Sequence, residues 1–327
     1  MKDLIINFSH QLRDAVKIGE NFTLHSKKRS YKNVIISGLG GSGIGGTIVS
    51  EFVSDTSILP INVIKGYDIP KYINEDTLVI CSSFSGNTEE TIEVFKKSLH
   101  KNCEIVCISS GGFLIELAKQ KNLNYILLPK AKSPRTMIGY SITQILFILY
   151  NYKIINYDFV NEILNSADLI DEYQNEIQNE SKKITDILFG KIPILYSCEG
   201  FSGMITRFKQ QLNENSKMLG FTNTIPEMNH NELVGWRNKN NNLAVIFFKN
   251  EKDYYRNIKR LEINKKIISK YTSSVIEIES KGNSIIENTF YLINLCDHVS
   301  YNLSKKNNVI AEEIDVIDYL KSELKKV

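Results

Sequence analysis

The sequence has no CxxC pair, and its five cysteines stand in or beside apolar segments of the chain. None of its five histidines has the spacing to a cysteine that zinc sites use. A free cysteine packs as a small apolar side chain, so this pattern fits a chain without structural disulfides in a reducing compartment. We therefore expect no metal site.

Long runs of one charge and long apolar runs are also missing. Lysine and arginine number 40 against 37 aspartates and glutamates, and a net charge of +3 is too small to indicate nucleic-acid binding. The longest apolar candidate, 142–148, is interrupted by Thr143 and Gln144 and is much shorter than a bilayer span. Residues 1–8 are typical of an amphipathic helix and not of a signal peptide. We expect a soluble, cytoplasmic protein that binds neither nucleic acid nor membrane.

The first half of the chain alternates strand and helix patterns. Its 327 residues, 42% of them hydrophobic, suffice for two globular domains. We expect strands at 33–37, 61–65, 77–82, 104–109 and 125–128, and helices at 44–52, 89–99, 114–121 and 137–150. Such alternation predicts a parallel sheet with helices on both faces and a ligand beyond the carboxyl ends of the strands.

A second alternation follows a polar, asparagine-rich stretch. We expect helical segments at 159–188, 200–219, 254–270, 284–304 and 314–326, and strands at 192–197, 243–249 and 274–279. The two halves look like two versions of one α/β architecture, so we divide the chain into domains at 1–155 and 156–327.

A glycine-rich turn, Gly38–Gly46, separates the first strand from the first helix of the alternation. It contains GxGxxG, which is a dinucleotide-binding pattern when an acidic residue ends the second strand. The second strand and its end, Ile61–Gly66, contain no acidic residue. The turn is better explained as an anion site, where bare main-chain N–H groups around Gly41 and the Ser42 hydroxyl meet a ligand at a helix N-terminus.

A second polar turn, Ser82–Thr91, has the sequence SSFSGNTEET and follows the third strand. The hydroxyls of Ser83, Ser85 and Thr88, with free N–H groups at a helix N-terminus, suit a phosphate monoester. The alternative is helix capping with loop polarity. A cap needs one hydroxyl and several are present here, which favours the phosphate site.

These residues carry a resemblance to a known family. The form SxSGNTxET resembles the signature of sugar isomerase (SIS) domains. The turn GGSGxGG, the pair Pro134–Arg135 and the later segment Pro226–Glu232 resemble the bifunctional phosphoglucose/phosphomannose isomerase family over almost the whole chain. The resemblance implies two SIS domains, each a doubly wound, flavodoxin-like parallel sheet flanked by helices. It also implies that the second domain carries the catalytic glutamate and histidine.

The activity implied is an aldose–ketose isomerisation through a cis-enediol, between glucose 6-phosphate and fructose 6-phosphate. Such a reaction needs a group for ring opening, a carboxylate that moves a proton between two carbons, and a cation or donor for the enediolate. By resemblance, Glu214 is the base and His230 opens the ring. In this family the histidine reaches the neighbouring subunit, so a homodimer is implied. No metal or organic cofactor is needed.

Two further residues match the family pattern. Arg135 matches the arginine that faces the enediolate, a role that suits its planar guanidinium. Lys321 matches a C-terminal lysine that contacts sugar hydroxyls, although an exposed lysine on the last helix would have the same pattern. Where the family has a Pro-Thr segment before that helix, this chain has Ala311–Ile314, which leaves the use of mannose 6-phosphate open.

Two other functions fit the phosphate loops. A sugar-phosphate sensor built on SIS domains would need these loops but not the set Glu214, His230 and Arg135. An aminosugar-phosphate isomerase or deaminase would share the SGNT turn but would not be expected to carry the Asn-His-Asn-Glu segment. The presence of both features favours the aldose–ketose isomerase.

Overall fold

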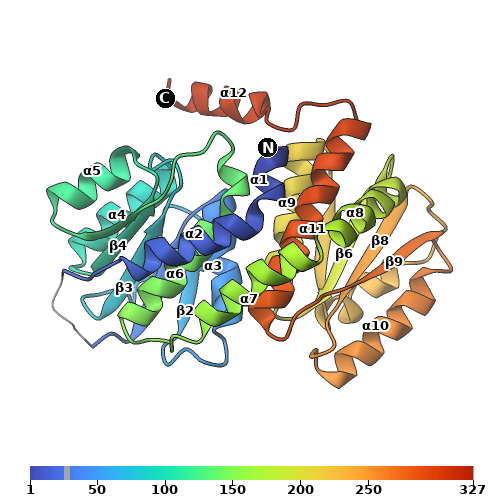
Figure 1. Ribbon diagram of the computed structural model, residues 1–327, viewed down its shortest axis with the longest axis horizontal. Helices are drawn as coiled ribbons and strands as arrows, with labels where there is room; N and C mark the ends of the chain where they lie inside the picture. The colour runs from blue at the N-terminus through green and yellow to red at the C-terminus, as the bar shows by residue number, and fades with distance from the viewer. Residues whose placement is uncertain (26–29, 327) are drawn as a thin grey trace. The chain divides into compact units, whose positions relative to one another are not determined.

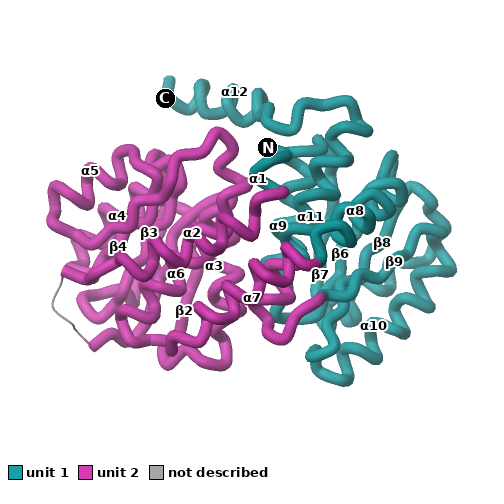
Figure 2. Tube along the Cα trace, viewed as in Figure 1, with its two compact units in different colours: residues 1–5, 173–280, 292–327 teal, residues 6–172, 281–291 magenta. Residues whose placement is uncertain are grey.

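The computed structural model describes residues 1–25 and 30–326. The chain forms two compact units, and neither is one continuous segment (Figures 1 and 2). Unit 1, teal in Figure 2, comprises the described parts of residues 1–5, 173–280 and 292–327; unit 2, magenta, comprises those of 6–172 and 281–291. The division into domains between residues 155 and 156 stays a prediction, since the units are defined by compactness.

Unit 2 is built on a five-stranded sheet of order β2-β1-β3-β4-β5, in which every pairing is parallel. Its strands are β1 (Asn33–Ser37), β2 (Ile61–Ile64), β3 (Thr77–Ser82), β4 (Glu104–Ser109) and β5 (Asn124–Leu127). The strand order reverses between β1 and β3, which makes the carboxyl ends of these two strands the expected ligand position. The predicted parallel α/β architecture is confirmed.

Helices cover both faces of this sheet. They are α2 (Phe8–Glu20), α3 (Gly40–Phe52), α4 (Glu89–His100), α5 (Gly112–Gln120), the short 3-10 turn η1 (Pro134–Thr136), α6 (Ile138–Asn151) and α7 (Phe159–Glu172). Ile35 belongs to a core with Val94 and Leu114, on the α4 and α5 side. Ile36 faces the other way, because a Cβ added to Gly46 of α3 would lie 2.7 Å from it. Strands buried on both faces explain the continuous apolar runs in the sequence.

Unit 1 contains a four-stranded sheet of order β7-β6-β8-β9, also parallel throughout. The strands are β6 (Ile192–Cys198), β7 (Phe221–Ile225), β8 (Leu243–Lys249) and β9 (Ser274–Glu279). The remaining elements are α1 (Lys2–Ile6), α8 (Gln174–Leu188), α9 (Ser202–Ser216), η2 (Glu227–His230), η3 (Glu232–Gly235), α10 (Tyr255–Ile268), α11 (Ile285–Lys306) and α12 (Asp315–Leu324). α11 begins in unit 2 and continues in unit 1. Tyr196, Met228, Trp236 and Phe247 lie together in the core of the second sheet.

Several details differ from the sequence expectations, and three concern the elements described above. The strand β7 was missed, because it lies at the edge of its sheet and Ile225 is its only fully buried residue. The helical pattern 159–188 is two helices, α7 and α8, with a break at Tyr173 that no proline or glycine marks. The helix α3 begins at Gly40, inside the glycine-rich turn. In the described part of the chain, no helix combines the length and apolarity needed to cross a membrane.

Candidate active site

The loop between β3 and α4 folds around its own hydroxyl groups. A hydrogen bond of 2.8 Å joins Ser83 Oγ to Thr88 Oγ1, and Ser83 Oγ also accepts from the Gly86 main-chain nitrogen at 3.2 Å. Ser85 Oγ accepts from the Asn87 main-chain nitrogen at 3.2 Å. Thr88 occupies the N-cap position of α4, yet its side chain makes no capping hydrogen bond. Helix capping therefore does not explain why this loop is rich in hydroxyls.

Two glycines allow this loop to touch the loop that follows β4. Gly86 has a φ of +71°, and a Cβ there would lie 1.8 Å from the carbonyl oxygen of Gly111. Gly112 has a φ of +70°, and a Cβ there would lie 2.4 Å from the carbonyl oxygen of Ser85. A side chain at either position would force the two loops apart and would be strained by its backbone angle.

The Ser42 side chain links the glycine-rich turn to the same loop. Ser42 is buried at the start of α3, and its Oγ accepts a hydrogen bond from the Phe84 main-chain nitrogen at 3.3 Å. A Cβ added to the neighbouring Gly41 would meet nothing within 4 Å, so open space adjoins the turn. The two loops thus meet beyond β1 and β3, where the strand order reverses and where two helix N-termini favour an anion.

Lys65 brings a positive charge beside the glycine-rich turn, which sequence reasoning did not identify. It follows the last residue of β2, and Ile64 accepts a hydrogen bond from the Gly38 main-chain nitrogen at 3.3 Å. Its Cε would be 3.6 Å from a Cβ added to Gly43. Partial burial lowers the pKa of Lys65, and the charge of Glu51 opposes this shift. Lys65 lies about 20 residues after the turn in the sequence, and no sequence pattern predicts that it lies beside the turn in the fold.

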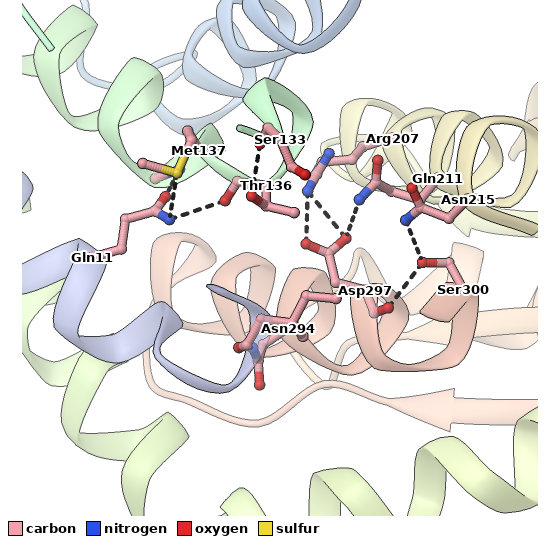
Figure 3. A network of polar contacts seen from close by, with 12 residues as sticks. Gln11, Ser133, Thr136, Met137, Arg207, Gln211, Asn215, Asn294, Asp297 and Ser300 are labelled. Carbon is pink, nitrogen blue, oxygen red and sulfur yellow. Dashed lines mark hydrogen bonds and ion pairs between the residues drawn. The ribbon is translucent and has the colours of Figure 1, made fainter. Parts of the chain in front are cut away.

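The short turn η1 presents Arg135 within unit 2. Gln11 of α2 fixes the turn: its Nε2 donates to the Thr136 carbonyl oxygen at 2.9 Å, and its Oε1 accepts from the Gly139 main-chain nitrogen at 2.8 Å (Figure 3). Ser133 is also buried and accepts from Thr136 Oγ1 at 2.8 Å. The turn contacts α3, so Arg135 is half-buried on a segment that lies against the helix of the glycine-rich turn.

Glu214 lies in the last turn of α9 in unit 1, and a buried polar network fixes that helix. Arg207 Nη2 donates to both carboxylate oxygens of Asp297 on α11, at 3.0 and 2.7 Å, and Gln211 Nε2 donates to one of them at 2.9 Å. Arg207 and Asp297 are only 2% and 4% exposed, so neither could lose its partner without leaving a buried charge. Figure 3 shows three side chains on one face of α9 pointing toward α11: Arg207, Gln211 and Asn215.

A cavity of about 330 Å³ adjoins Glu214. The end of α9 and the start of α12 form its walls. Its lining comprises Asn213, Glu214, Lys217, Met218, Leu219, Glu313, Ile314, Asp315, Val316 and Ile317. The half-buried residue Glu214 therefore lines a space in unit 1 that is large enough for a small molecule.

His230 ends the turn η2, and its side chain is exposed. The residues before it are anchored. Met228 is fully buried in the core of the second sheet, and Asn229 Nδ2 donates to Asn264 Oδ1 of α10 at 2.7 Å. The imidazole therefore stands out from a turn whose neighbouring residues are fixed.

Lys321 lies in the middle of α12, where it is exposed. No residue of α12 is buried within the described chain, although its apolar side chains include the exposed Val316 and Leu320. The contact of Lys321 with a sugar stays a prediction.

The chain is similar to proteins of a known family. Residues 177–324 match the model of the bacterial phospho-glucose isomerase C-terminal SIS domain. The chain is 34% identical over 337 aligned positions to a bifunctional phosphoglucose/phosphomannose isomerase from Caldicellulosiruptor bescii, with 100% of this chain and 99% of that protein covered. A protein of the same name from Aquifex aeolicus is 33% identical over 299 residues, with 90% and 91% covered.

Solved structures share the fold. The C-terminal domain of glucosamine-fructose-6-phosphate aminotransferase from Francisella tularensis superposes with a TM-score of 0.77 at 13% sequence identity. The match covers 95% of this chain and 97% of that chain. At this identity the likeness concerns the fold alone.

Proposed function

The chain belongs to the bifunctional phosphoglucose/phosphomannose isomerase family, and on that premise we propose that it interconverts glucose 6-phosphate and fructose 6-phosphate. The reaction class is a cis-enediol isomerisation. The observation that supports it most directly is the hydrogen bond from the Phe84 nitrogen to Ser42 Oγ, because it links the two loops that are predicted to bind the phosphate.

The phosphate of the substrate binds at these loops. Ser83, Ser85 and Thr88 supply hydroxyls, while Gly41 and Ser42 supply main-chain and hydroxyl donors at the start of α3. Hydrogen bonds to a phosphate dianion are charge-assisted, and the two helix N-termini add favourable dipoles. Lys65 adds a cation nearby. The phosphate group does not react, but its binding fixes the position of the reacting carbons C1 and C2.

At the reacting end, the Glu214 carboxylate removes the proton from C2 of the aldose and returns it to C1. The electrons of the broken C–H bond form the enediolate with its negative charge on O1, which the Arg135 guanidinium stabilises. The C2 hydroxyl proton passes to O1, so that C2 becomes the ketone carbon when C1 is protonated. His230 opens the sugar ring before this step, and Lys321 contacts sugar hydroxyls. We propose a homodimer in which each His230 serves the partner's site. The route uses protein groups alone.

Glucose 6-phosphate is the preferred aldose in this proposal. The segment before α12, Ala311–Ile314, lacks the Pro-Thr expected of the family, and Ala311 is buried. Glu312 in this segment forms an ion pair with the amino group of Met1 at 3.1 Å. The segment thus makes contacts within unit 1 and lacks the family's threonine. We therefore propose mannose 6-phosphate as the slower substrate.

We place the protein in the cytoplasm. All five cysteines are free and buried, although Cys81 and Cys107 are cross-strand neighbours in β3 and β4. A chain with unpaired neighbouring thiols suits a reducing compartment. Phosphorylated hexoses are also charged and do not cross membranes unaided.

A coupled assay tests this proposal. Fructose 6-phosphate formation is followed with glucose 6-phosphate or mannose 6-phosphate as substrate. We expect turnover with both and a higher kcat/KM for glucose 6-phosphate. Ser42→Ala should raise KM about 10-fold, because it removes a donor to the phosphate and the link to Phe84. Ser50→Ala, on the same helix, removes only a bond to the Thr47 carbonyl and is the matched control. The proposed function would be refuted if the protein turned over neither glucose 6-phosphate nor mannose 6-phosphate.

A further inference from the structure

Glu232, two residues after His230, is held by two side chains of the second sheet. Tyr196 Oη of β6 donates to Glu232 Oε1. Asn223 Nδ2 of β7 donates to Glu232 Oε2 at 2.6 Å. Both carboxylate oxygens therefore accept strong hydrogen bonds from fixed partners. A carboxylate that accepts two such hydrogen bonds can hold the loop that contains His230 and Glu232 in place.

The partner Tyr196 is itself rigid. Its side chain is fully buried, and its ring centroid lies 5.3 Å from that of Phe247. Burial, and then the neighbouring Glu232 carboxylate, raise the pKa of Tyr196 far above its usual value, so the phenol keeps its proton and acts as a donor. Tyr196 Oη also accepts from Trp236 Nε1 at 3.2 Å. One buried hydroxyl thus ties Glu232 and Trp236 to β6.

Asn223 is fixed in one orientation. Its Oδ1 accepts a hydrogen bond from the Thr224 main-chain nitrogen at 2.8 Å, so its amide nitrogen must face Glu232. A glutamine at position 232 has only one acceptor oxygen, so its NH2 group would face either the Asn223 nitrogen or the Tyr196 hydroxyl, both of which donate to the carboxylate. Replacing Glu232 by glutamine therefore breaks one anchor while it preserves side-chain shape.

His230 lies between two anchored residues. On one side Asn229 bonds to α10, and on the other Glu232 bonds to β6 and β7. The Asn231 side chain accepts from the Glu232 main-chain nitrogen at 2.5 Å, which fixes the short connection. An exposed imidazole on a loose loop would sample many positions, and a misplacement of about 1 Å can cost about 100-fold in rate. The anchoring of Glu232 reduces that freedom.

We infer that Glu232 is a positioning residue for ring opening, and that it acts on the reaction only through the placement of His230. The inference rests on the proposed function. The Glu232 carboxylate does not exchange protons with substrate in this account. Its contribution is to keep the His230 imidazole where the ring oxygen of the sugar arrives.

A double-mutant cycle tests the inference. Glu232→Gln should lower kcat for glucose 6-phosphate about 10-fold to 100-fold and leave KM within about 3-fold. It should slow enzyme-catalysed exchange between the α and β anomers of glucose 6-phosphate, observed by NMR, by the same factor. Binding of an open-chain five-carbon aldonic acid phosphate should stay within about 2-fold of wild type, because this analogue needs no ring opening. In a His230→Asn background, Glu232→Gln should cause no further loss.

The controls separate positioning from folding. Glu227→Gln removes the same charge from the same loop, but Glu227 is exposed and accepts a hydrogen bond from Asn231 Nδ2 at 2.7 Å that a glutamine oxygen can also accept. It should leave kcat within about 2-fold. If Glu232→Gln unfolds the protein, Asn223→Ala takes its place, since Asn223 is only half-buried and its removal frees one carboxylate oxygen.

The outcomes are distinct. The inference would be overturned if the loss of kcat from Glu232→Gln added fully to the loss from His230→Asn. It would also be overturned if Glu232→Gln weakened binding of the open-chain analogue as much as it lowers kcat. Either result would leave the proposed isomerase function standing. Absence of isomerisation by the unchanged protein would refute the proposed function, and the inference with it.

Discussion

Lys217 Nζ donates a hydrogen bond of 2.6 Å to the main-chain oxygen of Glu214. The same ammonium donates to the carbonyl oxygens of Ile310 and Glu313, at 2.9 and 2.8 Å. Lys217 itself has left-handed backbone angles, φ 55° and ψ 38°, at the C-cap of α9. One side chain therefore ties the end of the helix that carries Glu214 to the segment that leads into α12.

Lys217→Met should disconnect these two segments. The variant keeps the aliphatic stem but loses three charge-assisted hydrogen bonds, which at an exposed site contribute about 1 kcal/mol to the free energy of unfolding. We expect kcat for isomerisation to fall about 10-fold, because the cavity beside Glu214 loses its fixed shape. Lys209→Met on the same helix is the control. Unchanged kcat in Lys217→Met would show that the tether does not serve the reaction.

Gly86→Ala should damage the phosphate loop. The new Cβ would lie 1.8 Å from the Gly111 carbonyl oxygen and would face a backbone φ of +71°. We expect a loss of about 2 kcal/mol or more in the free energy of unfolding. Inorganic phosphate should raise the melting temperature of the wild type but not of the variant.

The matched control for this loop is Gly66→Ala. A Cβ at Gly66 would meet nothing within 4 Å, and Gly66 is not among the glycines with positive φ. Equal phosphate protection in the Gly86 and Gly66 variants would count against a phosphate site at this loop.

The buried His298 predicts a pH dependence of stability. Burial first, and then the charge of Lys2, lower the pKa of His298 to about 4. Its Nε2 has no hydrogen-bond partner in the described part of the chain. Between pH 4 and the ordinary pKa near 6.5, the unfolded chain binds more protons than the folded one, so stability falls as the pH is lowered through this window.

The expected effect is about 2 kcal/mol in the free energy of unfolding between pH 7.5 and pH 5, with neutral pH the more stable condition. Urea unfolding at the two pH values measures it. His298→Leu should lose most of this difference, while the exposed His100→Gln should keep it. An unchanged difference in His298→Leu would assign the pH dependence to other groups.

The two anion-binding turns could be predicted from the sequence because each is a local pattern of a few residues. Ser83, Ser85 and Thr88 cluster within six residues between a strand and a helix, and the glycine-rich turn has the same local context. Parallel strands place both turns at one sheet edge, so their proximity followed from the fold class. The hydrogen bond between Ser42 and Phe84 agrees with that reasoning.

Contacts between residues far apart in the sequence could not be predicted from it. Arg207 and Asp297 are 90 residues apart, and each alone resembles an ordinary surface charge. Tyr196 and Glu232 lie 36 residues apart on a strand and a loop, with no shared pattern. Glu214 and Lys217 are three residues apart, a helical spacing that is also typical of an exposed charge pair. In the structure the Lys217 ammonium donates to the main-chain oxygens of Glu214, Ile310 and Glu313, and the contacts with the last two join segments far apart in sequence.

In the proposed reaction, Glu214 moves a proton between two carbons of a hexose 6-phosphate. The most direct measurement is the incorporation of solvent deuterium at C2 of glucose 6-phosphate, followed by NMR, in the wild type and in Glu214→Gln. We predict deuterium incorporation by the wild type and a loss of about 100-fold or more in the variant, as expected when a general base is removed. Wild-type protein that binds the sugar without exchange, as a sensor would, or a Glu214→Gln variant with full exchange, would contradict the account.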